Sequence, residues 1–78
     1  MKLIKNIKEL KQGDYVHYEI HDKHLRYGIF QNFEGERVYC FFGDSWEEAS
    51  KAKEMTFINL KEIKIYKYNK EEVIVEIL

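Results

Sequence analysis

The stretch YGIFQNFEGERVYCFF, Tyr27 to Phe42, decides how the rest of the chain is organised. Two runs rich in aromatic and β-branched residues, 27–33 and 37–42, are separated by the tripeptide Glu-Gly-Glu. Gly35 at its centre can adopt the positive φ of a tight reversal, because glycine has no Cβ that would clash there. The pattern therefore predicts a β-hairpin.

The second run of this hairpin carries apolar side chains on both faces. Successive side chains of a strand point to opposite faces, so Val38, Cys40 and Phe42 share one face while Tyr39 and Phe41 share the other. A sheet that is apolar on both sides must curl up or be covered. We therefore expect a mainly β fold, a small antiparallel barrel of about five or six strands with one short inserted helix.

The composition fits one small domain spanning residues 1–78, of which folding buries only roughly 60% of the surface. Apolar residues make up 45% of the chain, charged residues 35% and aromatic residues 15%, as in a folded globular protein. The single cysteine forms no internal disulfide, which suits a reducing setting. Lysines interrupt the apolar residues near the N-terminus, and no apolar run reaches membrane-spanning length. We expect a cytoplasmic protein, and the richness in Lys, Ile and Asn without proline is typical of low-GC bacteria and their phages.

The first residues allow two interpretations. In one, residues 1–5 form a short strand, and Asn6 and Glu9 make a capping box around a single helical turn. In the other, a longer amphipathic helix spans residues 2–11, because apolar residues there also recur at helical spacing. Residues 14–21 then alternate between apolar and polar side chains, which predicts a half-buried strand.

After the hairpin the character changes at SWEEASKAK, residues 45–53. Ser45 and Glu48 make a second capping box, which predicts a short helix whose Trp46 and Ala49 face the sheet. Residues 54–60 predict a strand, and NLKE after it repeats the earlier capped turn. Residues 63–68 and 71–78 predict a last hairpin, whose exposed edge can pair two chains. We therefore expect a monomer or a weak homodimer.

Several short patterns resemble a Tudor-like member of the SH3-like small-barrel class. They are the Gly-Asp-x-Val start at Gly13, RYGIF at 26–30, the Glu-Gly turn, VYCFFGD at 38–44 and FINL at 57–60. In Tudor domains the strand ends build an aromatic cage for a methylated Arg or Lys. Here Ser45-Trp46 and the predicted helix replace the aromatic-glycine pair that usually follows the acidic Asp44. The resemblance implies a binding module that docks on macromolecules such as RNA polymerase, helicases or ribosomal components.

Catalytic chemistry has little support in the sequence. On a strand His17 and His21 lie about 13 Å apart, too far to share a zinc ion, so these residues and His24 are expected to be exposed rather than metal ligands. Cys40 lies mid-strand on an apolar face, where thiols are normally inert. We therefore expect no enzyme activity, no metal and no cofactor.

The favoured hypothesis is a non-catalytic adaptor or inhibitor that docks on another protein, including a nucleic-acid enzyme. The candidate anchors are aromatic and the candidate rim is acidic, and together they are Tyr39, Phe41, Asp44, Trp46, Glu47 and Glu48.

The alternative hypothesis is RNA or DNA binding by lysine-rich terminal segments that meet in the fold. The candidate residues would contact phosphates or stack on bases, and they are Lys5, Lys8, Lys11, Lys61, Lys64, Tyr66, Lys67 and Tyr68. The net charge of −1 and the acidic middle of the chain oppose this hypothesis.

Overall fold

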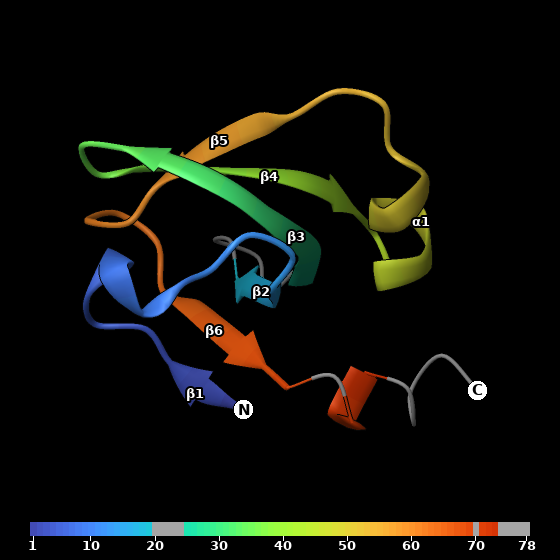
Figure 1. Cartoon of the computed structure of the whole chain (residues 1–78), viewed down its shortest axis with the longest axis horizontal. Helices are drawn as coiled ribbons and strands as arrows, with labels where there is room; N and C mark the ends of the chain where they lie inside the picture. Colours follow the sequence, from blue (N-terminus) through green and yellow to red (C-terminus); the bar gives the residue numbers. More distant parts are fainter. Residues whose placement is uncertain (20–24, 70, 74–78) are drawn as a thin grey trace.

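The computed structural model describes residues 1–19, 25–69 and 71–73. Its strands form one antiparallel sheet in the order β1-β6-β2-β3-β4-β5. The strands are β1 (Lys2–Leu3), β2 (Tyr15–Glu19), β3 (Leu25–Glu34), β4 (Arg37–Gly43), β5 (Thr56–Asn59) and β6 (Ile65–Tyr68). Figure 1 shows β3, β4 and β5 above, and β6 and β1 below, so the sheet bends over its own inner face.

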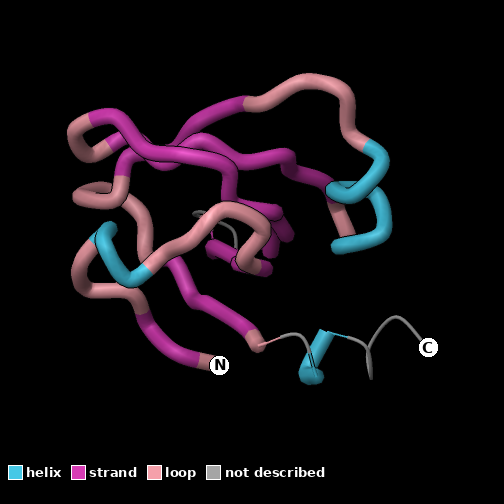
Figure 2. Tube along the Cα trace, in the orientation of Figure 1, coloured by secondary structure: helices cyan, strands magenta, loops and turns pink. Residues whose placement is uncertain are grey.

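The helical segments are short and lie at the margins of the sheet (Figure 2). They are the 3-10 helix η1 (Ile7–Glu9) and the helix α1 (Trp46–Lys51), together with a helical turn at residues 71–73. The expected mainly β fold with one inserted helix is confirmed. The sheet does not close into a complete barrel, because β1 and β5 remain its two edges.

The predicted hairpin is present as β3 and β4. Glu34 pairs with Arg37 across a two-residue turn, in which Gly35 has the positive φ of 61° that the sequence required. A bulge between Phe30 and Asn32 shifts the register of the two strands. Beyond the hairpin, β3 also pairs with β2, so this long strand joins the two halves of the bent sheet.

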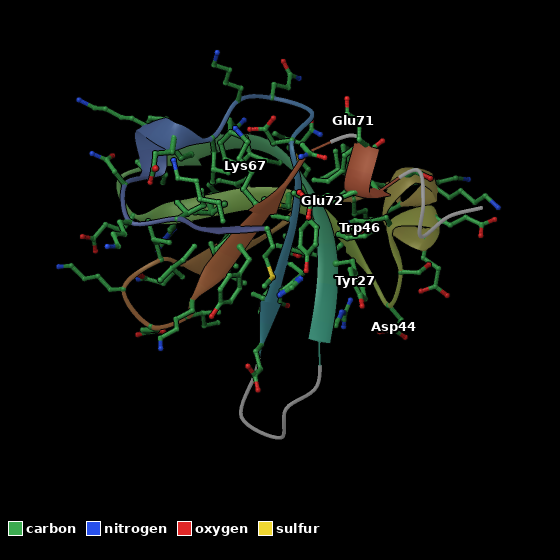
Figure 3. The ribbon with its side chains drawn as sticks, turned by 90° about the horizontal axis from the view of Figure 1, so that it is seen from below. Tyr27, Asp44, Trp46, Lys67, Glu71 and Glu72 are labelled. Carbon is green, nitrogen blue, oxygen red and sulfur yellow. The ribbon has the colours of Figure 1, made fainter. Side chains whose placement is uncertain are left out.

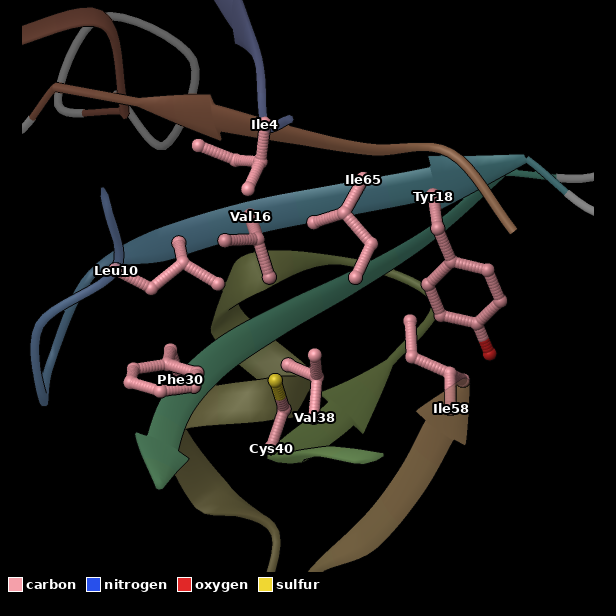
Figure 4. Close-up of a cluster of buried hydrophobic side chains, with 9 residues drawn as sticks. All are labelled: Ile4, Leu10, Val16, Tyr18, Phe30, Val38, Cys40, Ile58 and Ile65. Atoms are coloured by element: carbon pink, nitrogen blue, oxygen red, sulfur yellow. The ribbon is translucent and has the colours of Figure 1, made fainter. Parts of the chain in front are cut away.

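The core lies between the two halves of the sheet (Figure 4). It consists of buried side chains from the inner faces of the strands and from the N-terminal segment: Ile4, Leu10, Val16, Tyr18, Phe30, Val38, Cys40, Ile58 and Ile65. Phe42 packs against this cluster from β4, opposite Gly28. A Cβ at Gly28 would lie 2.6 Å from the Phe42 ring, so only glycine leaves room for that ring.

The N-terminal segment follows the first of its two interpretations. β1 pairs with β6, and η1 is capped by Asn6, whose side chain accepts a hydrogen bond from the Lys8 N–H. The Glu9 carboxylate in turn accepts from the Asn6 N–H, which completes the capping box. The continuous helix over residues 2–11 is therefore wrong, because strand pairing and the cap together satisfy the same backbone groups.

The predicted second strand of the last hairpin is also wrong where the structure describes it. Residues 71–73 form a helical turn instead. Asn69 accepts from the Glu72 N–H at 2.9 Å, and Glu72 accepts from the Asn69 N–H at 3.2 Å. This reciprocal cap begins a helical turn rather than a strand. Residues 74–78 lie outside the described part of the chain.

Candidate functional site

Aromatic side chains line the outer face of the sheet in two places. The first group lies over β2, β3 and β6 and is named the closed cluster: Tyr15, His17, Tyr27, Trp46, Tyr66 and Tyr68. The second lies over β4 and at β5 and is named the open patch: Tyr39, Phe41, Met55 and Phe57. The two groups differ in what covers them.

The closed cluster follows from the strand register. His17 lies directly opposite Tyr27 on β3 and Tyr66 on β6, and Tyr15 lies opposite Tyr68. Directly opposed residues point to the same face, so these rings must meet there. The His17 ring centroid is 5.1 Å from that of Tyr66 and 4.9 Å from that of Tyr68.

Trp46 covers this cluster from α1. Its ring centroid lies 4.8 Å from Tyr27 and 4.7 Å from Tyr68, both edge-to-face, and Figure 3 shows Trp46 beside Tyr27. The indole N–H donates to the Val16 carbonyl at 3.1 Å, and only 3% of the residue is exposed. The prediction that this indole packs on the sheet is confirmed. The sequence also suggested that Trp46 anchors a partner protein, and a side chain this buried does not fit that role.

The local sequence explains how α1 reaches this position. Ser45 caps the helix by accepting from the Glu48 N–H at 3.1 Å, while Glu48 accepts from the Asp44 N–H rather than from Ser45. Gly43 ends β4 against the helix, and a Cβ there would lie 2.8 Å from the Ala49 nitrogen. Glycine at this position therefore lets the helix pack directly on the end of the strand.

The expectation that His17 is exposed is wrong. Only 8% of His17 is exposed, because Tyr27, Tyr66 and Tyr68 surround its ring. The sequence pattern treated β2 as exposed on one side and did not anticipate the cover. His21 and His24 lie outside the described residues. Within the described residues, no three His, Cys, Asp or Glu side chains come together as a metal site would require.

The open patch follows from the pairing of β4 with β5. Tyr39 lies opposite Phe57, and their ring centroids are 5.5 Å apart. Met55 directly precedes β5, where alternation from Phe57 predicts the same outer face. The Arg37 guanidinium lies 4.6 Å from the centre of the Phe57 ring, a cation–π contact.

The open patch is accessible to solvent. Phe57 is 48% exposed and Met55 is 45% exposed, whereas Tyr39 and Phe41 are half-buried. The sequence placed Tyr39 and Phe41 on this outer face but did not single out Phe57, Met55 or Arg37. The alternation along residues 54–60 does predict Met55 and Phe57 on one side of their strand, opposite to the buried Ile58, but it gave them no functional assignment.

The predicted acidic residues gather at the start of α1. Asp44 lies 3.6 Å from the Arg26 guanidinium, and Glu47 pairs with Lys51 one turn along the helix at 3.2 Å. Glu48 accepts from the Asp44 N–H, so its carboxylate supports the helix cap. All three are exposed. They extend the outer surface beyond the Gly43 end of β4, whereas Arg37 lies at the opposite end of that strand.

The lysines of the two terminal segments do meet, because Lys2 lies opposite Lys67 on adjacent strands. Carboxylates neutralise part of the set: Lys2 pairs with Glu9 at 2.8 Å, Lys67 with Asp14 at 3.3 Å and Lys61 with Glu36 at 3.3 Å. Four more candidates are exposed, namely Lys5, Lys8, Lys11 and Lys64.

The two tyrosines of this alternative set belong to the closed cluster. Tyr66 and Tyr68 pack against His17, and Tyr68 also packs against Trp46. Both are half-buried, so the ring area left for a base to stack on is reduced. The lysine-rich surface therefore lacks an open aromatic platform at the positions where the sequence expected one.

Cys40 was the nucleophile considered in the sequence. It is completely buried in the core, and burial raises the pKa of its thiol to about 12. The thiol is therefore protonated at neutral pH and acts as a packing group.

Comparisons of this chain with protein-family models, with curated proteins and with solved structures found no match. Among the described residues, none of the helices has the length and apolar character needed to cross a bilayer.

Proposed function

We propose that this chain is a non-catalytic protein-binding module, and that it docks on a partner protein through the open patch. The observation that supports the proposal is the exposure of Phe57 and Met55 beside Tyr39 and Phe41 on one outer face. Clustered exposed apolar side chains mark interaction surfaces, whereas single ones are common on any protein. Aromatic residues and arginine are also the types enriched at interface hot spots, and Arg37 borders this patch.

The resemblance to SH3-like and Tudor-like barrels agrees with this role. The order β6-β2-β3-β4-β5, with a capped turn between β5 and β6, is compatible with a small barrel of that class. The module would differ from Tudor domains in its aromatic residues. Trp46 and its neighbours pack edge-to-face on one another in the closed cluster, which leaves the open patch as the more accessible cluster of aromatic rings on this face.

The charges around the open patch suggest the chemistry of the partner. Asp44, Glu47 and Glu48 lie beyond one end of β4, and Arg37 lies at the other. A partner that fits would place an apolar side chain against Phe57 and a basic group toward α1. A basic segment of a nucleic-acid enzyme that also carries an exposed apolar side chain would provide this combination.

The test compares three proteins as baits for partners from the source cells. The patch variant carries Tyr39→Ala and Phe57→Ala, and the control carries Phe33→Ala. Phe33 in β3 is 45% exposed, but it lies opposite Val38 and therefore on the other face of the sheet. We expect the wild type and the control to retain the same partner and the patch variant to lose it, while all three stay folded by circular dichroism. Equal capture by all three would contradict the proposal.

A salt titration of oligonucleotide binding tests the alternative. If the lysine-rich surface binds nucleic acid, affinity should fall steeply as salt rises, because released counterions drive such binding. Strong, salt-dependent binding that Lys5→Ala, Lys8→Ala and Lys11→Ala together remove would favour nucleic acid as the ligand instead. We expect no such binding.

A further inference from the structure

β5 is an edge strand with one hydrogen-bonding side turned away from the sheet. It pairs with β4 on one side and ends the strand order on the other, and the described part of the chain places no strand beyond it. The Leu60 N–H donates to the Glu36 carbonyl at 3.0 Å, and in an antiparallel ladder such bonded positions alternate. Ile58 and Thr56 therefore also point their backbone groups toward β4.

The intervening positions point the other way. By the same alternation, Phe57 directs both its N–H and its carbonyl away from β4, and so does Asn59. The Met55 carbonyl also points away, because it lies opposite to the Thr56 N–H in the same peptide unit. The Asn59 carbonyl already accepts from the N–H groups of Glu62 at 3.0 Å and Ile63 at 3.2 Å. The groups that remain at this edge are thus those of Phe57, the Asn59 N–H and the Met55 carbonyl.

The two edges of the sheet are protected to different degrees. β1 has only two residues, one of them Lys2, and such short and charged edges resist pairing with another chain. β5 reads Thr-Phe-Ile-Asn and contains neither a charge nor a proline. Its second residue, Phe57, is instead one of the most exposed apolar side chains of the described residues. β5 is therefore the edge that can accept a further strand.

We propose that β5 pairs with β5 of a second copy of this chain, antiparallel about a twofold axis that passes by Phe57. This inference rests on the open patch of the proposed function. In this register the Phe57 N–H of each copy donates to the Phe57 carbonyl of the other. The Asn59 N–H of each copy reaches the Met55 carbonyl of the other. Every outward group identified above then has a partner, which is the self-complementarity that a twofold interface requires.

The side chains match this register as well as the backbone does. Directly opposed residues share a face, so the two Phe57 rings would lie side by side on the outer surface. Each already contacts Tyr39 of its own chain. The pairing would therefore extend the aromatic row from Tyr39 and Phe57 of one copy into Phe57 and Tyr39 of the other. The net charge of −1 per chain gives little electrostatic repulsion between copies.

Area gives the pairing a consequence for docking, because the two joined patches stay on the outer surface, where one partner can contact both. A fully buried aromatic side chain contributes roughly 150–250 Å², so four partly exposed side chains offer on the order of 300–400 Å². A standard interface takes about 800 Å² from each partner. One open patch offers about half of that area, and two patches joined across the twofold axis approach the area that a docking partner needs from this module.

The experiment measures self-association of the purified chain by sedimentation across micromolar to millimolar concentrations. We expect a reversible monomer–dimer equilibrium for the wild type and for the Phe33→Ala control. Phe57→Ala keeps the backbone donor and should weaken the dimer. Phe57→Pro also removes the outward N–H but leaves the bonds of Ile58 to β4 in place, because edge strands tolerate proline where the N–H faces outward. Relative to Phe57→Ala, it should weaken the dimer by a further tenfold or more, since two hydrogen bonds are lost.

A second measurement needs no variant. Amide hydrogen exchange of the wild type should slow at Phe57 as concentration rises, while exchange at Ile58, which is bonded within the chain, should not change with concentration. A chain that stays monomeric at millimolar concentration, with exchange at Phe57 independent of concentration, would overturn the inference. Protection of Phe57 only when a captured partner is added would also overturn it and would assign the edge to that partner. In both cases the docking test with Tyr39→Ala and Phe57→Ala stands on its own result.

Discussion

The closed cluster and the open patch are built from the same kind of residue on the same outer side of one sheet. The closed cluster buries Trp46 and His17, whereas the open patch leaves Phe57 and Met55 exposed. In the closed cluster, Trp46 from α1 contacts the rings of Tyr15, Tyr27 and Tyr68. In the open patch, Phe57 has Tyr39 and Arg37 as neighbours and remains 48% exposed. The difference lies in the cover and not in the strands.

The comparison teaches how a small domain divides its aromatic residues between stability and recognition. A chain of 78 residues cannot enclose all its rings in one core. Here Trp46 from one short helix covers the outer face over β2, β3 and β6, and the rings over β4 and β5 are left for contact. Changes to the cover should therefore act on stability, and changes to the patch on association.

The largest effect is expected for Trp46→Ala, which removes the cover. The buried indole and its hydrogen bond to the Val16 carbonyl are lost, and Trp→Ala changes in cores cost about 3–5 kcal/mol. Thermal unfolding should show a drop in Tm of more than ten degrees, since about 1 kcal/mol corresponds to about 4–8 °C at this size.

Phe57→Ala is the matched control for that change, because it removes a ring from the open patch. We expect a loss of less than about 1 kcal/mol, since half of this side chain is already in water. Equal destabilisation by Trp46→Ala and Phe57→Ala would show that the two faces do not differ as described.

A smaller effect is expected for Gly43→Ala, which adds a methyl group against α1 but keeps Trp46 in place as a side chain. The new Cβ would lie 2.6 Å from the Glu48 Cβ and 2.8 Å from the Ala49 nitrogen, and the backbone there can yield only if α1 moves. We expect a loss of about 1–3 kcal/mol, as for overpacked sites. The fluorescence of Trp46, the only tryptophan, should shift to the red as its ring meets water.

Ser50→Ala is the control within the same helix, because Ser50 is exposed and its hydroxyl donates only to the Glu47 carbonyl one turn back. It should leave the emission of Trp46 unchanged. An unshifted spectrum for Gly43→Ala would mean that α1 tolerates the added methyl group.

The smallest effect is expected for Glu9→Gln, in η1 and outside both aromatic groups. The side-chain hydrogen bond from Lys2, followed by those from the N–H groups of Asn6 and Lys5, lowers the pKa of Glu9 from 4.5 to about 2. A lowered pKa means that the ionised carboxylate stabilises the fold above about pH 4.5 and that this contribution is lost as pH falls toward 2.

Urea titrations of the wild type and Glu9→Gln should therefore differ most at neutral pH and converge in acid. The difference is a surface effect and should shrink in high salt. Curves that stay separated by the same amount down to pH 2 would assign the effect of the substitution to something other than the charge of Glu9.

The parts of the fold that were predictable from the sequence are the local ones. The hairpin of β3 and β4 needed only alternation and a glycine with positive φ, and the turns after Asn6 and Asn59 needed only a capping residue. One capped turn of the same kind was not predicted. Asn69 and Glu72 repeat the Asn-x-x-Glu pattern and start a helical turn where alternation favoured a strand.

The parts that escaped prediction depend on contacts between distant segments. His17 is buried because Tyr66, from the last strand, lies opposite it and packs on its ring. The residues around His17 in the sequence do not predict this contact. Trp46 could be placed on the sheet-facing side of its helix from spacing alone, but its burial excludes the anchor role that its residue type suggested. The open patch was half predictable: Tyr39 and Phe41 follow from the hairpin, whereas Phe57 joins them only through the register of β5.

The position of β6 has a consequence for synthesis of the chain on the ribosome. β6 follows the other strands in the chain, yet it lies between β1 and β2 in the sheet. The β3–β4 hairpin can form in the nascent chain as soon as both strands emerge. β1 and β2, in contrast, each have one edge that stays unpaired until β6 (Ile65–Tyr68) has been synthesised. Translation that stops before Ile65 therefore releases fragments with unsatisfied strand edges, and such fragments are substrates for aggregation or for quality-control proteases.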